Sequence, residues 1–321
     1  AADRRHHDLG HGFDGLRGDD KGDQFGTVDL VTDVHHSPHD LTRFAWLSIG
    51  AALSTMMLKA VAAALTGSVG LLSDAAESVV NLVAGVVALV ALRAVAKAPD
   101  DEFAYGREKA EYLSAGVEGT MIILAAAWIA YVAIDRLVHP TGVEQLGVGL
   151  IVSTAAGILN FVVATILLRA AKRYSSMTLE ADGTHLMTDV WTSVGVLVGI
   201  GLVAGTGWNW LDPIIALGVA ANIVLSGFTL IRRSVRGLLD EALPTADLDR
   251  VNQILSSYES SNIQFHAVRS RRAGRRTFMS LHVLVPGAQT VAVAHDLVER
   301  IEDDLHEAIE HLTVIAHLEP L

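Results

Sequence analysis

Long apolar stretches recur along this chain, separated by short polar segments. Each stretch has roughly the 20 residues that a helix needs to cross about 30 Å of hydrocarbon. The stretches cover residues 41–66, 68–96, 107–138, 145–171, 176–204 and 212–236. The pattern therefore predicts an all-α membrane domain, a bundle of six transmembrane helices that has a lipid bilayer around it.

The pattern changes beyond Pro244. Apolar residues then recur with helical spacing in two segments and alternate, as they do in strands, in three others. In chain order these segments are 245–258 (helix), 263–272 and 276–285 (strands), 291–309 (helix) and 312–320 (strand). The order αββαβ predicts a small α+β domain. We therefore expect a transmembrane domain over residues 41–240 and a soluble domain over residues 241–321.

The first forty residues follow neither pattern. They contain many Gly, Asp and His and no continuous apolar run, so we expect a disordered tail over residues 1–40 rather than a cleavable signal peptide. The sequence leaves open whether the tail binds metal, since histidines also occur in solvated tails without that role. Its histidines are His6, His7, His11, His35, His36 and His39.

Basic residues lie beside alternate ends of the predicted spans. Cytoplasmic loops retain Lys and Arg, so these residues mark the cytoplasmic face. They are Arg43, Arg93, Lys97, Arg107, Lys109, Arg169, Lys172, Arg173, Arg232, Arg233 and Arg236. We therefore expect a multi-pass protein of the cell membrane (the inner or plasma membrane), with both termini and the soluble domain in the cytoplasm.

The composition limits the chemistry of any binding site. The chain has no cysteine, which excludes disulfides and thiolate metal sites. A metal ion must then be held by imidazole, carboxylate, amide or water. The net charge of -12 gives no reason to expect a nucleic-acid partner.

Polar residues inside two of the predicted spans are the main candidates for function. Ionisable groups at membrane depth are costly, so they usually face a partner, a bound ion or water. The second span carries Asp74, Glu77 and Asn81, and the fifth carries His185 and Asp189. Residues four apart lie on the same face of a helix, so two facing helices could supply four ligands to a divalent transition-metal ion.

Two alternatives stay open for these residues. The polar groups could simply hydrogen-bond one another between helices. Asp74 lies near the start of its span, where lining the approach to the site or capping the helix is an alternative to direct ligation.

The chain resembles the cation diffusion facilitator family, and within it the bacterial ferrous-iron and zinc efflux proteins. The resemblance runs from about residue 41 to the end and includes motifs in the second and fifth spans. The matching segments are GSVGLLSDAAES (67–78), YGREKAEYL (105–113), HLMTD (185–189), LDP (211–213), LLDEALP (238–244) and IAHLEP (315–320).

The resemblance implies a homodimer in which each subunit exchanges a cytoplasmic divalent metal ion for protons. It places the transport site on four residues, which are Glu77, Asn81, His185 and Asp189. Many members have Asp-Asp or His-Asp where this chain has Glu77 and Asn81. An amide oxygen is a poorer zinc ligand than a carboxylate, so we expect the site to lean toward Mn2+ or Fe2+ without excluding Zn2+.

A second family site, in the loop before the third span, is altered here. It uses an Asp and two His in some bacterial members. This chain keeps Asp100 but has Phe103 and Arg107 at the His positions. We expect this loop not to bind metal as it does in those relatives.

The resemblance also implies a metal cluster in the cytoplasmic domain. The candidate ligands are His266, His282, His295, His317 and Glu319, with Glu319 in place of the usual Asp and Ala267 in place of another ligand. His317 and Glu319 are two residues apart and so lie on the same face of a strand. The alternative is that these are ordinary surface histidines. Lys109 and Asp240 match a pair that forms a salt bridge at the membrane surface in relatives.

These features predict an efflux transporter for a divalent transition metal, working by metal/proton antiport. Zn2+ and Fe2+ are the first candidates, followed by Mn2+, Co2+ and Cd2+. We expect no enzyme activity and no catalytic cofactor, because H-E-x-x-H and comparable acid/base motifs are absent from the spans. The alternative is a membrane metal sensor that signals through the cytoplasmic domain. A sensor would need the cytoplasmic histidines but not Glu77 and His185.

Overall fold

The computed structural model describes residues 41–66, 69–139, 148–208 and 210–321. The predicted tail over residues 1–40, with its six histidines, lies outside the described residues.

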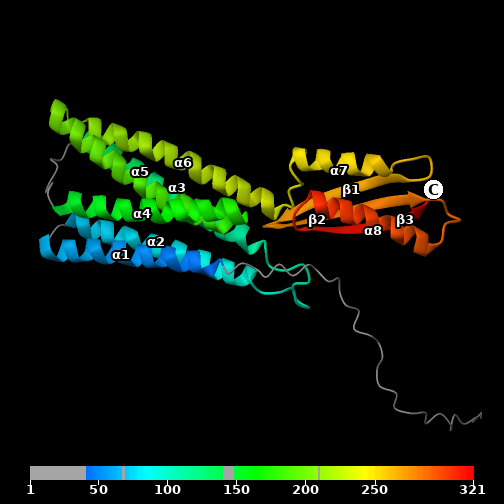
Figure 1. The fold of residues 1–321 in the computed structure, drawn as a ribbon. Helices are drawn as coiled ribbons and strands as arrows, with labels where there is room; N and C mark the ends of the chain where they lie inside the picture. Colours follow the sequence, from blue (N-terminus) through cyan, green and yellow to red (C-terminus); the bar gives the residue numbers. More distant parts are fainter. Residues whose placement is uncertain (1–40, 67–68, 140–147, 209) are drawn as a thin grey trace, which may run out of the picture. The chain divides into compact units, whose positions relative to one another are not determined.

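Six long helices make up the first part of the described chain (Figure 1). Helix α1 packs mainly against α2, α3 against α6, and α4 against α5. Further contacts of α5 with α3 and α6 join these pairs into one bundle. The helices are α1 (Thr42–Thr66), α2 (Val69–Val95), α3 (Ala110–Val138), α4 (Val148–Tyr174), α5 (Met177–Thr206) and α6 (Leu211–Leu238).

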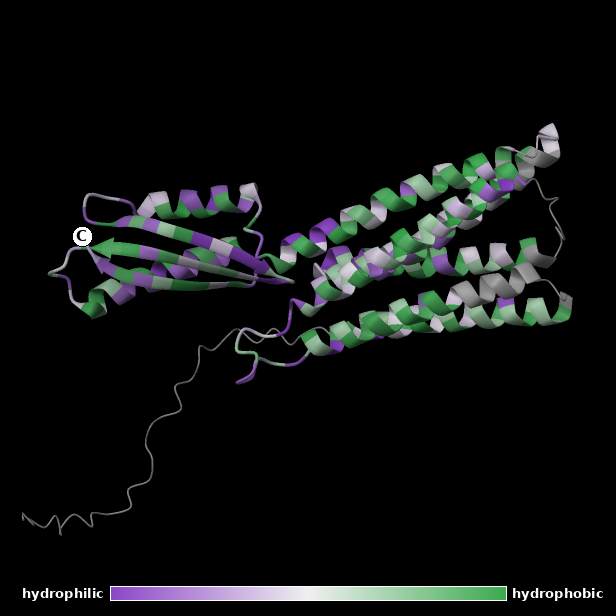
Figure 2. Ribbon diagram, turned by 180° about the vertical axis from the view of Figure 1, so that it is seen from behind, coloured by the Kyte–Doolittle hydropathy of each residue, from purple (hydrophilic) through white to green (hydrophobic). Residues whose placement is uncertain are grey.

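The outer surface of the bundle is apolar. Hydrophobic residues cover most of the exposed ribbon in Figure 2, and large side chains such as Leu65, Leu124 and Trp128 are exposed. Among the described residues, five helices are long and apolar enough to cross a membrane, namely α1 to α4 and α6. Helix α5 is not one of them; it carries Glu180, Asp182 and Asp189.

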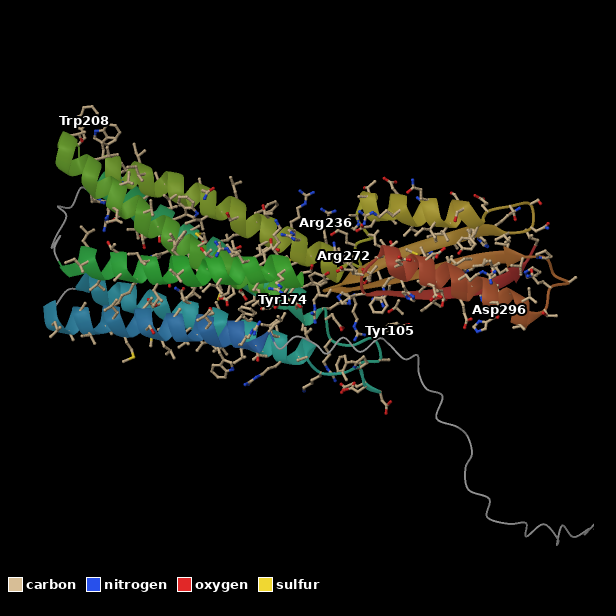
Figure 3. All side chains as sticks on the ribbon, in the orientation of Figure 1. Tyr105, Tyr174, Trp208, Arg236, Arg272 and Asp296 are labelled. Carbon is tan, nitrogen blue, oxygen red and sulfur yellow. The ribbon has the colours of Figure 1, made fainter. Side chains whose placement is uncertain are left out.

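The two ends of the bundle differ in chemistry. Trp208 lies at one end, while Tyr174 and Arg236 lie at the other (Figure 3). Trp208 stacks on Trp210, with ring centroids 5.5 Å apart. Tryptophan is enriched at membrane interfaces and arginine on the cytoplasmic side, so both ends have the residues expected of a transmembrane bundle.

The C-terminal part is a three-stranded sheet with two helices on one face. Strand β2 lies between the other two, antiparallel to β1 and parallel to β3. Side chains of β2 such as Met279 and Leu281 pack against Leu255 of α7 and Ile301 of α8. The elements are α7 (Thr245–Tyr258), β1 (Gln264–Ala273), β2 (Arg276–Val285), α8 (Val291–Ala308) and β3 (Leu312–Pro320). A helical membrane domain followed by an αββαβ domain confirms the predicted fold class.

The register of the sheet places three histidines side by side. His266 of β1 pairs with His282 of β2, and His282 pairs with His317 of β3. A shift in register follows His266, where Ala267 has a positive φ of 52°. Because neighbours along a strand alternate between faces, these histidines lie on the face opposite Leu281 and the buried core.

Candidate metal sites in the bundle and the sheet

Polar side chains from α2 and α5 meet inside the bundle. His185 Nε2 lies 2.8 Å from Asn81 Oδ1, and Asn81 Nδ2 donates a hydrogen bond to Asp189 Oδ2. An amide oxygen only accepts, so His185 Nε2 is the donor to Asn81. Asn81 therefore joins the two predicted α5 ligands into one chain of hydrogen bonds.

The sequence did not single out a fourth member of this cluster, Asn160 of α4. Asn160 is buried, and its Nδ2 lies 3.3 Å from Asp189 Oδ2. One polar residue in the middle of the fourth span was the only available signal, and a single buried amide is a common feature of helix packing. The structure adds α4 to the elements that form the site.

Two of the predicted ligands cannot be placed at the atomic level. Helix α2 contains Asp74 and Glu77, and Glu77 precedes Asn81 by about one turn. The side chains of both acidic residues lie outside the described part of the structure. Their roles in the site remain predictions.

The bundle cluster has the composition of a cation site. His185 and Asn81 are 3% and 6% exposed, so little water reaches them. Asp189, whose carboxylate is half-buried, receives amide hydrogens from both Asn81 and Asn160. Imidazole nitrogen, carboxylate oxygen and amide oxygen are ligands for borderline and harder divalent ions. If a metal ion binds, bonds from these residues to the ion can therefore replace the hydrogen bonds between them.

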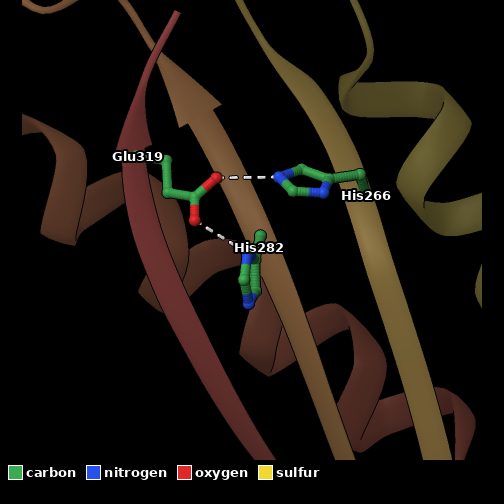
Figure 4. Close-up of side chains that lie close together, drawn as sticks. All are labelled: His266, His282 and Glu319. Carbon is green, nitrogen blue, oxygen red and sulfur yellow. Dashed lines mark hydrogen bonds and ion pairs between the residues drawn. The ribbon is translucent and has the colours of Figure 1, made fainter.

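A second cluster lies on the open face of the C-terminal sheet. Glu319 Oε2 lies 2.8 Å from His266 Nε2, and Glu319 Oε1 lies 2.9 Å from His282 Nδ1 (Figure 4). Candidate ligand atoms of these three residues all lie within 4.8 Å of one another. His317 Nε2 is slightly farther away, 3.7 Å from Glu319 Oε1.

The histidines also lower the pKa of the Glu319 carboxyl. The hydrogen bond from His266 lowers the pKa of this carboxyl, and the charges of His282 and His266 add to the effect. An ordinary Glu is already ionised at neutral pH, and the lowered pKa keeps the Glu319 carboxylate ionised and available as a ligand under more acidic conditions as well. Its neighbours His266 and His317 are exposed enough for an ion to reach them from solution.

His295 is not part of this cluster within one chain. It lies on α8, where its Nε2 is 3.3 Å from Glu299 Oε1, four residues further along the helix. Its predicted role as a ligand would require a contribution from another subunit.

The loop before α3 holds an ion pair at the altered family site. Arg107 Nη2 lies 2.5 Å from Asp100 Oδ2, and the guanidinium is 4.2 Å from the centre of the Phe103 ring. The hydrogen bond from Arg107 lowers the pKa of Asp100. Arg107 thus places a positive charge beside Asp100.

The predicted salt-bridge pair lies where α3 begins and α6 ends. Lys109 Nζ is 3.0 Å from Asp240 Oδ1, and Arg271 Nη1 of β1 is 3.3 Å from the same oxygen. The hydrogen bonds from Lys109 and then Arg271 lower the pKa of Asp240. Asp240 therefore joins the start of α3, the end of α6 and strand β1.

Comparisons with known proteins cover nearly the whole described chain. The family model for the cation efflux transmembrane domain matches residues 45–239, and that for the cytoplasmic domain of cation efflux proteins matches residues 243–321. An uncharacterized transporter of Synechocystis sp. is 50% identical over 87% of this chain and 90% of its own length. The cation-efflux pump FieF of Salmonella arizonae is 28% identical over 87% of this chain and 93% of its own length.

Solved structures similar to part of this chain include a domain of another transporter. The metal-bound C-terminal domain of the CzcD transporter from Thermotoga maritima is 26% identical, with a TM-score of 0.22. The match covers 24% of this chain and 94% of that chain.

Proposed function

Because this chain belongs to the cation diffusion facilitator family of cation efflux transporters, we propose that it exports a divalent transition-metal ion in exchange for protons. In this proposal Glu77, Asn81, His185 and Asp189 bind the ion within the membrane. Asp74 lies on the approach to this site. The protein works as a homodimer in the inner or plasma membrane, with both termini in the cytoplasm.

The observation that carries the proposal is the hydrogen-bonded cluster of Asn81, His185 and Asp189. These residues come from α2 and α5, far apart in sequence, and the first two are buried. Polar groups inside a membrane bundle are costly to bury, so they usually mark a functional site. The side chains of these three residues are suitable metal ligands.

The exchange for protons follows from the chemistry of the same ligands. A metal ion binds imidazole and carboxylate only in their deprotonated forms, so metal and protons compete for His185 and Asp189. Binding of the ion from the cytoplasm displaces protons to that side. Protonation from the opposite side then releases the ion, and the proton gradient sets the direction.

The described ligands favour no single metal. Asn81 and Asn160 offer neutral amide oxygens, which harder ions accept more readily than Zn2+ does. His185 favours Zn2+ and Fe2+. We therefore propose Zn2+ or Fe2+ as the principal substrate, with Mn2+, Co2+ and Cd2+ as further candidates.

A regulatory role is proposed for the sheet cluster. His266, His282 and Glu319 bring three ligand atoms together at an accessible surface, and His317 lies beside them. A cytoplasmic metal ion bound there would hold β1, β2 and β3 together, so that the domain senses the metal for the transporter. Alternatively, the ion would link two subunits through His295. A pure metal sensor is the alternative function, and it would require the cytoplasmic histidines but not Glu77 and His185.

The first prediction tests the transport site. We expect Asp189→Ala to abolish Zn2+-dependent proton flux in proteoliposomes, because it removes the only described carboxylate in the bundle cluster. Flux would be followed with a pH-sensitive dye inside the vesicles, for Zn2+, Fe2+, Mn2+, Co2+ and Cd2+ in turn. The surface variant Asp101→Ala serves as the control, and size-exclusion chromatography checks the assembly of both variants. Wild-type flux in Asp189→Ala would reject the proposed site.

A further inference from the structure

Two acidic side chains are buried in the bundle outside the transport site. Glu118 of α3 and Asp182 of α5 are both 0% exposed. Asp182 precedes His185 by three residues on α5, which places it about 4.5 Å closer to the start of that helix. The start of α5 follows the basic loop at the predicted cytoplasmic face, so Asp182 lies between the transport site and the cytoplasm.

Only one oxygen of each carboxylate has a hydrogen-bond partner. Ser114 Oγ donates to Glu118 Oε1 at 3.0 Å, and Ser48 Oγ of α1 donates to Asp182 Oδ1 at 2.8 Å. Glu118 Oε2 and Asp182 Oδ2 are buried without a partner among the described residues. Within the same residues, no Lys, Arg or His forms an ion pair with either carboxylate.

Two ionised carboxylates cannot easily share such a site. Helix α3 packs against α5, and Ala115 and Ile122, one turn before and after Glu118, lie in the same buried cluster as Ala181, the neighbour of Asp182. Two like charges in a dry environment strongly favour the binding of a proton by one of them. The groups that face the pair are the hydroxyls of Ser48 from α1 and Ser114 from α3, and His185 is the nearest predicted cation ligand on α5. These hydroxyls carry no charge that would neutralise the two carboxylates.

Glu111, another buried acid on α3, is held differently. One of its oxygens accepts hydrogen bonds from Ser176 Oγ at 2.5 Å and from the Thr178 backbone NH at 3.2 Å. It lies seven residues before Glu118 along the helix, about two turns away. Glu111 thus fastens the start of α5 to α3 with one oxygen, while its Oε1 has no partner among the described residues. Glu118 and Asp182 each accept a single hydrogen bond from a serine, and neither receives a backbone NH of the described chain.

We propose that Glu118 and Asp182 form a proton-binding site that is separate from the metal ligands and that releases its proton to the cytoplasm when a divalent ion binds at His185 and Asp189. This inference rests on the proposed transport function and deepens it. The positive charge of the ion favours the ionised form of the nearby pair. The O–H bond of one carboxyl then breaks, and the proton leaves as H+ without any change of oxidation state.

The ligands of the transport site give a reason for a separate proton-binding pair at Glu118 and Asp182. Asn81 and Asn160 have no titratable proton to exchange, although both amides belong to the cluster. A metal ion that binds there displaces fewer protons than it would from carboxylates at the same positions. The carboxyl pair supplies a proton that the amides cannot.

The test counts the protons released when Zn2+ binds to the full-length protein. Calorimetry in buffers of different ionisation enthalpy gives this count, and subtraction of the Asp189→Ala value isolates the transport site. We expect Glu118→Gln and Asp182→Asn each to release about one proton fewer per bound Zn2+ than wild type, with Zn2+ stoichiometry unchanged. Glu111→Gln is the matched control and should release as many protons as wild type.

Unchanged proton release in Glu118→Gln, or an equal loss in Glu111→Gln, would overturn the inference. Infrared difference spectra of the wild-type protein give a second test that needs no variant. The C=O stretch of a protonated carboxylic acid should disappear when Zn2+ is added, and its persistence would also overturn the inference. The proposed function fails separately, if Asp189→Ala still supports metal-driven proton flux.

Discussion

Asn81 contacts both of the predicted α5 ligands. Its amide accepts from His185 and donates to Asp189, so one side chain sets the separation and the charge of the site. A carboxylate at this position would accept only, and it would place a second negative charge beside Asp189. Residue 81 is therefore the position at which we predict that a single substitution changes metal preference.

We predict that Asn81→Asp binds Zn2+ about tenfold more tightly at neutral pH, since an added anionic ligand worth about 1.4 kcal/mol gives that factor. Zinc binding should also weaken more steeply as the pH falls, because protons compete for one more carboxylate. Calorimetric Kd values measure both effects. Asn262→Asp, at an exposed turn, is the control for added charge, and weaker Zn2+ binding by Asn81→Asp would contradict the prediction.

The side chains that the sequence missed depend on how the helices pack. Asn160 is the only amide on α4, and Glu118 shares α3 with Glu111, but neither helix carries a pattern that identifies the residues it faces. Asn160 contacts Asp189 on α5, and Glu118 lies where α3 packs on α5, so their roles depend on the rotation of α3 and α4 toward α5. His185 and Asp189 could be predicted because their four-residue spacing is local to one helix.

The helices and strands themselves follow closely from the apolar pattern. The predicted span 212–236 corresponds to α6, Leu211–Leu238, and the predicted strand 276–285 corresponds exactly in its bounds to β2. Apolar length determines a membrane helix, and alternation determines a strand that is buried on one face. The shift in register after His266 was not predictable, because it depends on the positive φ of Ala267.

Helices α3 and α6 approach closely at two glycines. A Cβ added at Gly227 of α6 would lie 2.8 Å from Ile123 Cγ1 and 3.1 Å from the carbonyl oxygen of Gly119. At Gly119 of α3, an added Cβ would lie 2.8 Å from Ile231 Cγ1. Small residues let the two helix backbones approach this closely. In a membrane this close packing stabilises the helix pair, because apolar side chains gain little by leaving lipid for a contact with each other.

We predict that Gly227→Leu separates α3 from α6 and lowers stability by about 1–3 kcal/mol, the usual cost of overpacking. The midpoint of thermal unfolding in detergent should fall, as measured by light scattering or fluorescence. Gly218→Leu on the same helix is the matched control, because a Cβ there meets nothing within 4 Å. Equal midpoints for the two variants would contradict the close packing of α3 on α6.

The sheet contacts the ends of the membrane helices through a small set of polar links. Arg276 Nε of β2 lies 2.8 Å from Glu108 Oε1, just before α3. The Gly274 backbone NH, in the turn between β1 and β2, donates to the Tyr112 hydroxyl at 3.0 Å. Together with Asp240, these contacts attach the β1–β2 hairpin to α3 and α6. A metal ion bound at the proposed site on β1, β2 and β3 would thus act on a sheet that is joined to the helices of the bundle.

Asp240 gives this connection a pH dependence. Lys109 and Arg271 lower its pKa in the folded protein, so its ionised form favours the folded state. The contribution is complete above the pKa of an unfolded Asp, about 3.9, and is lost as the pH falls through the lower folded value. At neutral pH we expect Asp240→Asn to unfold at a lower temperature than wild type, by a few degrees at most, because the groups are partly exposed.

The difference between the two proteins should therefore shrink as the pH falls below about 4, and it should vanish once the pH is below the lowered pKa of Asp240 in the folded protein. Asp249→Asn, on helix α7, is the matched control and should show no comparable loss at neutral pH. Thermal unfolding of both variants and wild type across this pH range measures the effect. A constant difference at every pH would mean that Asp240 acts through shape alone, and the ionic link between α3, α6 and β1 would have to be abandoned.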